Sequence, residues 1–369
     1  MKILQLLTRR QYRGAEVAAA TFSNEFIRKG HQVIFTGLYS APAYSLKVEG
    51  AMNIDIHARK SFFSIAGFIR LIKLIRKENP DILHANGSDT LKYLIAVKLI
   101  HPSSIVVYRN ISVISHWRGN NLLKKWFYNS LIQKTDFVTS VGDTSRIDFI
   151  KTLNYPEQKI EVVRRGIRIP QVQRNKISER EAFSIPLGNL VLIHVGNFSP
   201  EKGHFFLIDS FVKIKARFRP VTLLLLGEGE LQAEIKNKVI TLKLEKDVLF
   251  LNLQENISPY LNVADLILLT SKIEGVPGVL LEAAAHHVPA VALHVGGVGE
   301  CVIDDETGRL IDEENIEVFS DEVVRLLEDD VERKRLGENA GRFVKENYDL
   351  DKGTRKFISI FENLLNKAK

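Results

Sequence analysis

Short apolar runs alternate with longer amphipathic segments along the N-terminal half of the chain. Residues 3–7 and 32–37 are almost entirely apolar, and residues 15–29 between them repeat apolar side chains at helical spacing. This order predicts a strand, a helix and a second strand, the first unit of a parallel sheet. Strands covered on both faces show no alternation, and further runs of this kind predict strands over 81–84, 104–108 and 136–140.

The same pattern starts again after a polar stretch, residues 171–188, which is predicted to be a linker because prolines lie near its ends. The second half predicts strands over 190–195, 221–226, 248–251, 264–270 and 289–293, and helices over 204–217, 231–244 and most of 316–369. We therefore expect an α/β fold of two doubly wound, Rossmann-like domains. Ligands bind outside the carboxyl ends of the strands in such folds, so the two facing domains should form a cleft.

The expected boundaries follow from where the pattern stops and restarts. They place an N-terminal domain over 1–170, the linker over 171–188 and a C-terminal domain over 189–345, followed by a last helix, 346–369, that packs back on the N-terminal domain. A chain of 369 residues is long enough for each domain to build its own core.

Composition is that of a globular protein, with 45% hydrophobic and 26% charged residues, which excludes disorder, collagen and coiled coil as the main state. The net charge of +7 is unevenly divided. Residues 1–170 hold 26 Lys and Arg against 12 Asp and Glu, a balance of +14, whereas the rest of the chain is at −7. A basic half suggests a nucleic acid, a membrane surface or an anionic substrate as partner.

A single cysteine, Cys301, excludes an intramolecular disulfide and a cysteine-based metal site. The N-terminal apolar run is too short for a signal peptide, and no apolar run approaches the length of a membrane-spanning helix. We therefore expect a cytoplasmic protein. A peripheral position at the inner face of the membrane is compatible with this expectation.

The stretch 271–282, SKIEGVPGVLLE, is the most informative segment of the second half. A predicted strand ends in a loop that holds Glu274, and a helix is predicted to begin near Gly278 and to carry Glu282 one turn later. Helix N-termini offer free N–H groups and a positive dipole to phosphates, while a carboxylate at position 282 can accept two ribose hydroxyl hydrogen bonds. The alternative interpretation is that Glu274 caps the helix and Glu282 is a solvated helix residue.

This segment and those around it resemble the GT-B glycosyltransferases of family 4, the retaining, nucleotide-sugar-dependent group. The two glutamates are separated by seven residues and followed by AAAHHVPAVA, then by GGVGE at 296–300 and DETGRLI at 305–311. The similarity covers nearly the whole chain and is strongest over 191–311. It implies that Glu274 contacts hydroxyls of the donor sugar and that Glu282 holds the ribose.

Three further stretches resemble the family. The turn GNFSPEKG at 196–203 leads to Lys202, which the resemblance makes a diphosphate ligand, although Asn197 stands where the family has an arginine. LGEGE at 226–230 resembles the turn near the nucleoside, and RGAE at 13–16 resembles a double-glycine loop of which only Gly14 is present. The expected catalytic residues are Glu274 and Lys202; the expected donor-binding residues are Gly14, Asn197, Lys202, Glu228, Glu274, Gly275, Val276, Pro277, Gly278, Val279, Leu280 and Glu282.

Bland interpretations of these residues remain open. Taken alone, Lys202 reads as an exposed surface lysine, and Gly14 reads as an ordinary turn between a strand and a helix. The first domain contains fewer stretches that resemble the family. DILHAN at 81–86 resembles the strand end that faces the acceptor, and a family histidine that follows the next strand has no direct counterpart. The acceptor-side candidates are therefore His84, Arg109, Asn110 and His116, with a structural role as the alternative for the strand-end histidine.

No required metal or cofactor is expected. Asp349 and Asp351 form a D-x-D, but at the start of the last predicted helix they are expected to cap it. His286 and His287 are adjacent on a helix and point about 100° apart, so they cannot share a metal. The nucleotide sugar is a substrate in this scheme.

A second basic feature is a helix predicted over 61–77, with Phe62, Ile65, Ile69 and Ile72 on one stripe beside Arg70, Lys73, Arg76 and Lys77. Residues 124–127, KKWF, repeat the combination. Basic-aromatic helices can lie in a membrane interface, and the alternative is a core-packed helix with a solvated basic face. No nucleic-acid-binding motif is present.

Together these observations predict a retaining glycosyltransferase that moves a hexose-like sugar from a nucleotide-sugar donor, with UDP as the prior for the nucleotide, to a hydroxyl of a glycan or lipid-linked acceptor. Bacterial surface polysaccharide or glycolipid synthesis would be its setting. Two alternatives of the same fold are a nucleotide-sugar epimerase and a catalytically weakened nucleotide-sugar-binding protein. A dinucleotide oxidoreductase is disfavoured because no G-x-G-x-x-G follows the first strand.

Overall fold

The computed structural model describes residues 1–42, 44–115, 122–169, 180–183 and 185–368. Within them the chain forms two compact units. Unit 1 consists of Met1–Gly166 together with Leu350–Lys369, and unit 2 consists of Ile167–Asp349. Most of the linker predicted over 171–188 lies outside the described residues, as does His116. The last helix therefore belongs to unit 1, together with the N-terminal part of the chain.

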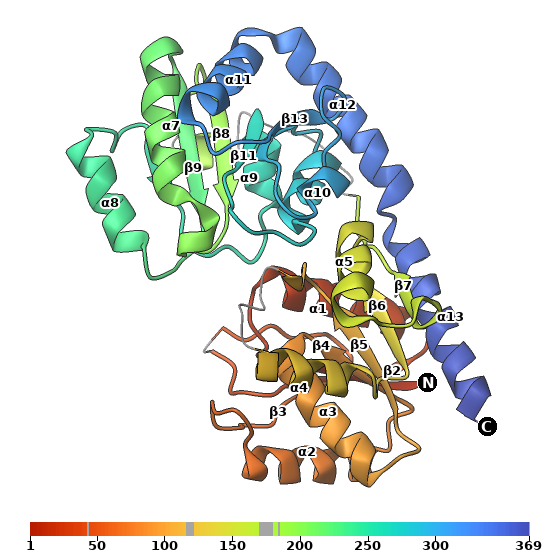
Figure 1. Ribbon diagram of the computed structural model, residues 1–369. Helices are drawn as coiled ribbons and strands as arrows, with labels where there is room; N and C mark the ends of the chain where they lie inside the picture. The colour runs from red at the N-terminus through yellow and green to blue at the C-terminus, as the bar shows by residue number, and fades with distance from the viewer. Residues whose placement is uncertain (43, 116–121, 170–179, 184, 369) are drawn as a thin grey trace. The chain divides into compact units, whose positions relative to one another are not determined.

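Unit 1 is built on a parallel sheet whose seven strands, within the described residues, follow the order β3-β2-β1-β4-β5-β6-β7 (Figure 1). They are β1 (Lys2–Leu7), β2 (Gln32–Gly37), β3 (Met52–Asp55), β4 (Ile82–Asn86), β5 (Ile105–Asn110), β6 (Phe137–Ser140) and β7 (Ile160–Val162). The strand order reverses between β1 and β4, and such a switch point is where ligands bind in open α/β sheets.

Six helices cover this sheet in the described part of unit 1: α1 (Gly14–Arg28), α2 (Ile65–Glu78), α3 (Ser88–Ile100), α4 (Leu122–Ile132), α5 (Asp143–Leu153) and α13 (Leu350–Ala368). Helix α13, dark blue in Figure 1, packs on α1. Its Phe357 and Phe361 meet Phe22 and Phe26 of α1 with ring centroids 4.8–6.0 Å apart. The C-terminal helix thereby completes one of the two cores of unit 1.

Unit 2 repeats the architecture with a six-stranded parallel sheet, within the described residues, in the order β10-β9-β8-β11-β12-β13. The strands are β8 (Leu190–Val195), β9 (Val221–Leu226), β10 (Val248–Phe250), β11 (Leu266–Leu269), β12 (Ala290–Leu293) and β13 (Gly308–Ile311). The helices are α7 (His204–Arg217), α8 (Gln232–Thr241), α9 (Ser258–Val263), α10 (Gly278–Ala285), α11 (Ile316–Glu328) and α12 (Asp330–Asn347). Here the strand order reverses between β8 and β11.

The expected α/β architecture of two doubly wound sheets is confirmed, and most predicted strands match within two residues. The strands β3, β7 and β13 are absent from the sequence-based prediction because each has only three or four residues and carries polar side chains. Strands β10 and β12 are as short but wholly apolar, and the sequence predicts them, so the polar side chains are what interrupt the apolar run on which the prediction depends.

Helix α2 departs from the prediction over 61–77. It begins at Ile65, where the Ser64 hydroxyl accepts a hydrogen bond from the Gly67 amide at 3.2 Å. Its buried face contains Leu71, Leu74 and Ile75, so the predicted Ile65–Ile69 stripe faces solvent. The helix turns this way because Gly67 packs closely on Ala58, where an added Cβ would lie 2.6 Å from the alanine Cβ.

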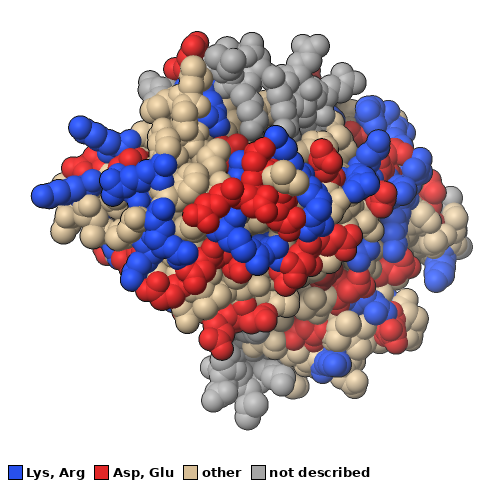
Figure 2. All heavy atoms as spheres, turned by 90° about the horizontal axis from the view of Figure 1, so that it is seen from above, with Lys and Arg blue, Asp and Glu red and all other residues tan. Residues whose placement is uncertain are grey.

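In the face shown by Figure 2, acidic and basic side chains are interspersed. Unit 2 contains several ion pairs: Arg309 contacts Glu322 and Glu332, Arg335 contacts Glu332, and Arg333 contacts Asp330. Among the described residues, no helix combines the length and apolar character needed to cross a bilayer.

Candidate functional site

Four loops of unit 2 meet at the carboxyl edge of its sheet, where they follow β8, β9, β11 and β12. Backbone hydrogen bonds tie them together. The Phe198 amide donates to the Glu228 carbonyl at 3.0 Å, and the Leu231 amide donates back to the Phe198 carbonyl at 3.0 Å. The Lys272 amide donates to the Glu201 carbonyl at 2.8 Å, so the loops after β8 and β11 are also joined.

Lys202 and Glu274 form an ion pair at this edge. The Lys202 Nζ lies 2.7 Å from the Glu274 Oε1, and the two side chains are 23% and 11% exposed. Lys202 ends the 3₁₀ turn η3 (Pro200–Lys202) after β8, and Glu274 lies in the loop after β11. These are the two strands between which the strand order reverses, so residues 72 positions apart meet where the fold places a ligand.

Glycines allow these loops to approach so closely. Gly203 has φ +69°, and a Cβ there would lie 2.1 Å from the Thr270 carbonyl oxygen. Gly227 has φ +138°, and a Cβ there would lie 2.0 Å from the Gly196 carbonyl oxygen. Backbone atoms cannot yield as a flexible side chain can, so only glycine fits at both positions.

Two buried histidines lie beneath the Lys202 loop. The His194 Nδ1 lies 2.9 Å from the Leu268 carbonyl oxygen, and the His204 ring stacks on Phe198 with centroids 4.2 Å apart. Burial lowers the pKa of His194 to about 4 and that of His204 to about 2, with the Lys202 charge adding to both effects. Both rings are therefore neutral at physiological pH, and Lys202 supplies the positive charge at this place.

The predicted helix start near Gly278 is observed, since α10 begins there. The Leu280 amide donates to the Pro277 carbonyl at 3.2 Å, so it is engaged within the turn rather than open to a ligand as expected. Val279 and Glu282 are half-buried, and Glu282 has an interaction partner of its own. Asn197 is half-buried, whereas Glu228 is exposed and its Oε1 lies 3.5 Å from the Leu253 amide.

The carboxyl edge of the sheet in unit 1 brings together two of the four acceptor-side candidates. His84 and Arg109 are both buried on the face that α1 and α13 cover. The Arg109 guanidinium lies over the Phe22 ring at 5.1 Å and over the Phe357 ring at 5.6 Å. Burial lowers the pKa of His84 to about 3, with a smaller contribution from Arg109, so His84 is neutral.

The structure places Asn110 elsewhere. Its Nδ2 donates to the Ser145 carbonyl at 3.2 Å and lies 3.4 Å from the Ser140 Oγ, so it ties β5 to the start of α5. Gly14 is exposed at the start of α1, where its carbonyl accepts from the Arg165 Nη1 at 3.2 Å.

The histidines and aspartates considered for a metal have other contacts. The His286 ring lies 2.7 Å from the Asn262 Oδ1 and 3.1 Å from the Ser258 Oγ. Asp351 pairs with Lys29 at 2.5 Å and with Arg355 at 2.6 Å. Within the described residues, no three His, Cys, Asp or Glu side chains group as metal ligands.

Sequence reasoning missed the His194–His204 pair because both residues look like ordinary members of a strand and a helix. The signal that existed was the run GNFSPEKGH, in which histidine follows the loop glycine directly. It also missed Thr270, whose hydroxyl donates to the Lys202 carbonyl at 3.0 Å and anchors the lysine loop.

Two protein-family models match this chain. Residues 175–343 match the model of the glycosyl transferases group 1, and residues 12–169 match the model of glycosyltransferase family 4. The two matches follow one another along the chain and together include both carboxyl-edge sites.

Curated relatives and solved structures agree with these matches. The N-acetyl-alpha-D-glucosaminyl L-malate synthase of Bacillus anthracis is 28% identical over 83% of this chain and 81% of its own. The Escherichia coli UDP-Gal:alpha-D-GlcNAc-diphosphoundecaprenol alpha-1,3-galactosyltransferase is 25% identical over 71% of this chain and 70% of its own. The structure of Anabaena HepE with UDP and glucose has a TM-score of 0.83 at 19% identity and covers 98% of this chain and 99% of that one. That structural likeness shows the GT-B fold.

Proposed function

The chain belongs to the group 1 glycosyltransferases of family 4, and we propose that it transfers a sugar, with retention of configuration, from a UDP-linked donor to a hydroxyl group of a glycan or lipid-linked acceptor. The setting would be the synthesis of a bacterial surface polysaccharide or glycolipid. The observation that carries the proposal is the Lys202–Glu274 pair at the switch point of unit 2.

The chemistry of sugar transfer needs the charges that this pair supplies. Breaking the bond between the anomeric carbon and the phosphate oxygen leaves negative charge on the departing diphosphate, and preorganised cations at such a charge are usually the largest catalytic contribution. The Lys202 ammonium has three N–H donors, so it can keep one on Glu274 and turn another to a phosphate oxygen. Glu274 then keeps an oxygen for hydroxyls of the donor sugar and positions it.

The remaining donor residues follow the loops. The amide of Val279 at the start of α10 and the Gly14 loop are assigned to the diphosphate, Glu282 to the ribose and Glu228 to the nucleoside side. The acceptor oxygen bonds to the anomeric carbon on the face that the diphosphate leaves, and its proton passes to the departing phosphate. No metal enters this scheme, because Lys202 and backbone amides stabilise the leaving group.

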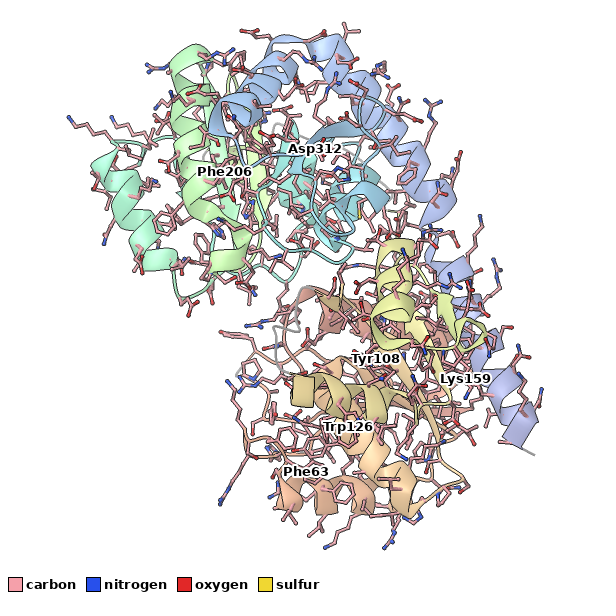
Figure 3. The ribbon with its side chains drawn as sticks, viewed as in Figure 1. Phe63, Tyr108, Trp126, Lys159, Phe206 and Asp312 are labelled. Carbon is pink, nitrogen blue, oxygen red and sulfur yellow. The ribbon has the colours of Figure 1, made fainter. Side chains whose placement is uncertain are left out.

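The acceptor is proposed to be anionic or membrane-borne. The names of two relatives point this way, since one makes a malate glycoside and the other acts on a diphosphoundecaprenol-linked sugar. In this chain, Ile65 and Trp126 are each 71% exposed (Trp126 is labelled in Figure 3), and Phe62 packs against Phe127 with ring centroids 5.4 Å apart. Exposed basic residues of α2, among them Lys73, accompany this apolar surface, as expected for binding to acidic lipid.

The first experiment is a thermal-shift screen of the full chain against nucleoside diphosphates and nucleotide sugars. A ligand that binds the folded state raises the unfolding midpoint by mass action, so UDP and one UDP-sugar should give the largest shifts. Mass spectrometry of reactions with a polyprenyl-diphosphate sugar then separates the candidates. A glycosylated acceptor supports transfer, an epimerised donor indicates an epimerase, and binding without turnover indicates a binding protein.

Membrane association has its own test. The full chain should sediment with vesicles that contain phosphatidylglycerol at low salt and be released at high salt, because exposed charges are screened. An Ile65→Gln, Ile69→Gln double variant should reduce sedimentation, whereas Val331→Gln, which changes an exposed apolar residue in unit 2, should not. Equal sedimentation of both variants would remove this surface from the proposal.

A further inference from the structure

Unit 1 contains a buried cation without a carboxylate partner. Arg109, at the end of β5, is 2% exposed. Among the described residues, no salt bridge or hydrogen bond reaches its guanidinium, and Nε is fully enclosed without a partner. Its neighbours are the ring of Phe22, on helix α1, and the ring of Phe357, on helix α13.

Such an arrangement is costly in an isolated protein. The effective penalty for burying an ion without a counter-ion is several kcal/mol, and a cation–π contact returns about 2 kcal/mol at most when it is desolvated. An apolar side chain of similar length would fill the same space without that penalty. Arg109 is therefore a poor packing residue, and its charge needs another explanation.

The surroundings of Arg109 are positive or neutral. Burial, with a smaller contribution from the nearby Arg165, lowers the pKa of Arg109 to about 9, so the side chain remains protonated at neutral pH. His84 packs edge-on against Phe357 and Phe361 and is held neutral. Arg165 itself reaches back to the Gly14 carbonyl. Among the described residues, no Asp or Glu forms a salt bridge or hydrogen bond with Arg109, which leaves a bound ligand as a source of negative charge.

The position of Arg109 in the sheet of unit 1 is one at which α/β folds bind ligands. Arg109 pairs in register with Asn86 of β4, and Asn86 donates from Nδ2 to the Gln5 Oε1 of β1 at 2.8 Å. The Asn86 Oδ1 is buried and has no hydrogen-bond partner among the described atoms. These residues stand on β1, β4 and β5, at and beside the point where the strand order of unit 1 reverses.

We propose that Arg109 is the anion-binding residue of unit 1 and that it takes a carboxylate or phosphate group of a substrate. A guanidinium presents two parallel N–H donors to either group, and the flanking rings of Phe22 and Phe357 hold its plane for that contact. The assignment rests on the proposed function, since the anion belongs to the donor or to the acceptor of sugar transfer. It makes Arg109 a residue that determines which substrate is accepted.

Isothermal titration of the full chain tests this proposal with three probes: UDP alone, and then inorganic phosphate and malonate added to UDP-saturated protein at constant ionic strength. Charge-assisted hydrogen bonds contribute about 1.5–3 kcal/mol, so Arg109→Met should weaken at least one probe about 10- to 100-fold. Loss of UDP affinity assigns the anion to the donor diphosphate. Loss of phosphate or malonate affinity assigns it to the acceptor or to a charged donor sugar.

Matched variants separate binding from packing. Arg355→Gln removes an exposed arginine of α13 and should leave all three affinities unchanged. Arg109→Lys keeps a charge but loses the planar fork, so it should bind more weakly than wild type and more tightly than Arg109→Met. Because a buried uncompensated charge is removed, the unliganded Arg109→Met protein should unfold at the same temperature as wild type or higher.

The outcomes are distinct for the two proposals. Wild-type affinity of Arg109→Met for all three probes overturns the assignment, and a lower unfolding temperature with those affinities intact gives Arg109 a packing role instead. Failure of the wild-type protein to bind UDP contradicts the proposed function. Phosphate and malonate are then titrated into the protein without UDP, and weaker binding of either one to Arg109→Met would still support the anion site.

Discussion

The two units carry their key cations in opposite ways. In unit 2, Lys202 is partly exposed and is neutralised by Glu274 at 2.7 Å. In unit 1, Arg109 is buried and, among the described residues, has aromatic rings rather than a carboxylate beside it. Both lie at the carboxyl edge of a parallel sheet, near the point where the strand order reverses.

The two cations differ in what neutralises their charge: a carboxylate of the protein in unit 2, and a bound anion, as proposed above, in unit 1. The charges of Lys202 and Glu274 compensate each other in the unliganded protein, and under the proposed function this pair is partly reorganised when a diphosphate binds. An unpaired guanidinium is already free to bind an anion, at the expense of the stability of the unliganded fold. Unit 2 is therefore expected to depend on its charges for catalysis, and unit 1 to depend on them for recognition.

The largest expected effect is on catalysis, from Lys202→Ala. Removing one preorganised donor from a developing negative charge typically lowers kcat about 10²- to 10³-fold, and Glu274 would also lose its partner. Initial rates with a UDP-sugar and acceptor measure the effect. Lys213→Ala, which removes an exposed lysine of α7 paired with Glu317, is the control and should keep the wild-type rate. Comparable rates for Lys202→Ala and the control would end the catalytic assignment.

The next largest effect is on the free energy of unfolding, and it distinguishes a glycine of unit 2, Gly203, from a glycine of unit 1, Gly14. Gly203→Ala places a Cβ 2.1 Å from a backbone oxygen at φ +69°, and left-handed strain with overpacking should lower the free energy of unfolding by about 2–5 kcal/mol. In Gly14→Ala the nearest atom is the Arg165 Nη1 at 3.7 Å, an ordinary contact. Urea denaturation should therefore show a change of less than about 1 kcal/mol for Gly14→Ala. Similar losses in both variants would contradict the close packing inferred for unit 2.

The sequence predicted unit 2 better than unit 1 for a physical reason. Its site is made of local loop motifs, so Lys202 and Glu274, which meet at the edge, could be named from the resemblance of those motifs to the family 4 glycosyltransferases. The environment of Arg109 depends on Phe357, which lies almost 250 residues later in the chain. Burial without a counter-ion is a property of tertiary packing, and no pattern around Arg109 reveals it.

The same limit explains helix α2 and the amide of Leu280. The apolar stripe of α2 was visible, but which face the sheet covers was decided by Gly67 against Ala58. The start of α10 was predicted at Gly278, but the turn that engages the Leu280 amide with Pro277 is a detail of the backbone. Element positions thus follow from the sequence, whereas exposure and hydrogen-bond partners follow from packing.

A smaller effect is expected from Glu274→Gln on the binding of UDP. Under the proposed function, Glu274 competes with a donor phosphate for Lys202, and a partly exposed ion pair contributes about 0.5–1 kcal/mol. Neutralising the carboxylate should therefore tighten UDP binding about two- to fivefold, although sugar transfer is lost. Titration calorimetry measures it, and the Lys202→Ala, Glu274→Gln double variant should bind no more tightly than Lys202→Ala. Unchanged UDP affinity in Glu274→Gln would show that the pair does not restrain Lys202.

An effect of similar size is the acid sensitivity of the two units, to which His84 contributes in unit 1 and His194 in unit 2. Burial lowers the pKa of His84 to about 3 and of His194 to about 4, whereas an unfolded histidine titrates near about 6.5. Below that value the unfolded state binds protons that the folded state rejects, so stability falls as the pH drops toward the folded pKa values. Between about pH 6.5 and 5.5 each histidine should cost about 1 kcal/mol.

Phenylalanine substitutions distinguish the two histidines by their hydrogen bonds. His84→Phe should remove that acid-induced loss without lowering stability near about pH 8, because neither ring nitrogen of His84 has a partner among the described atoms. His194→Phe should remove the same loss but lower stability at about pH 8 by about 1 kcal/mol, because the Leu268 carbonyl loses its bond to Nδ1. Urea denaturation across this pH range measures both terms. If the free energy of unfolding of either variant falls with decreasing pH as steeply as that of the wild type, the replaced histidine is protonated in the folded protein. The conclusion that its ring is neutral would then be wrong.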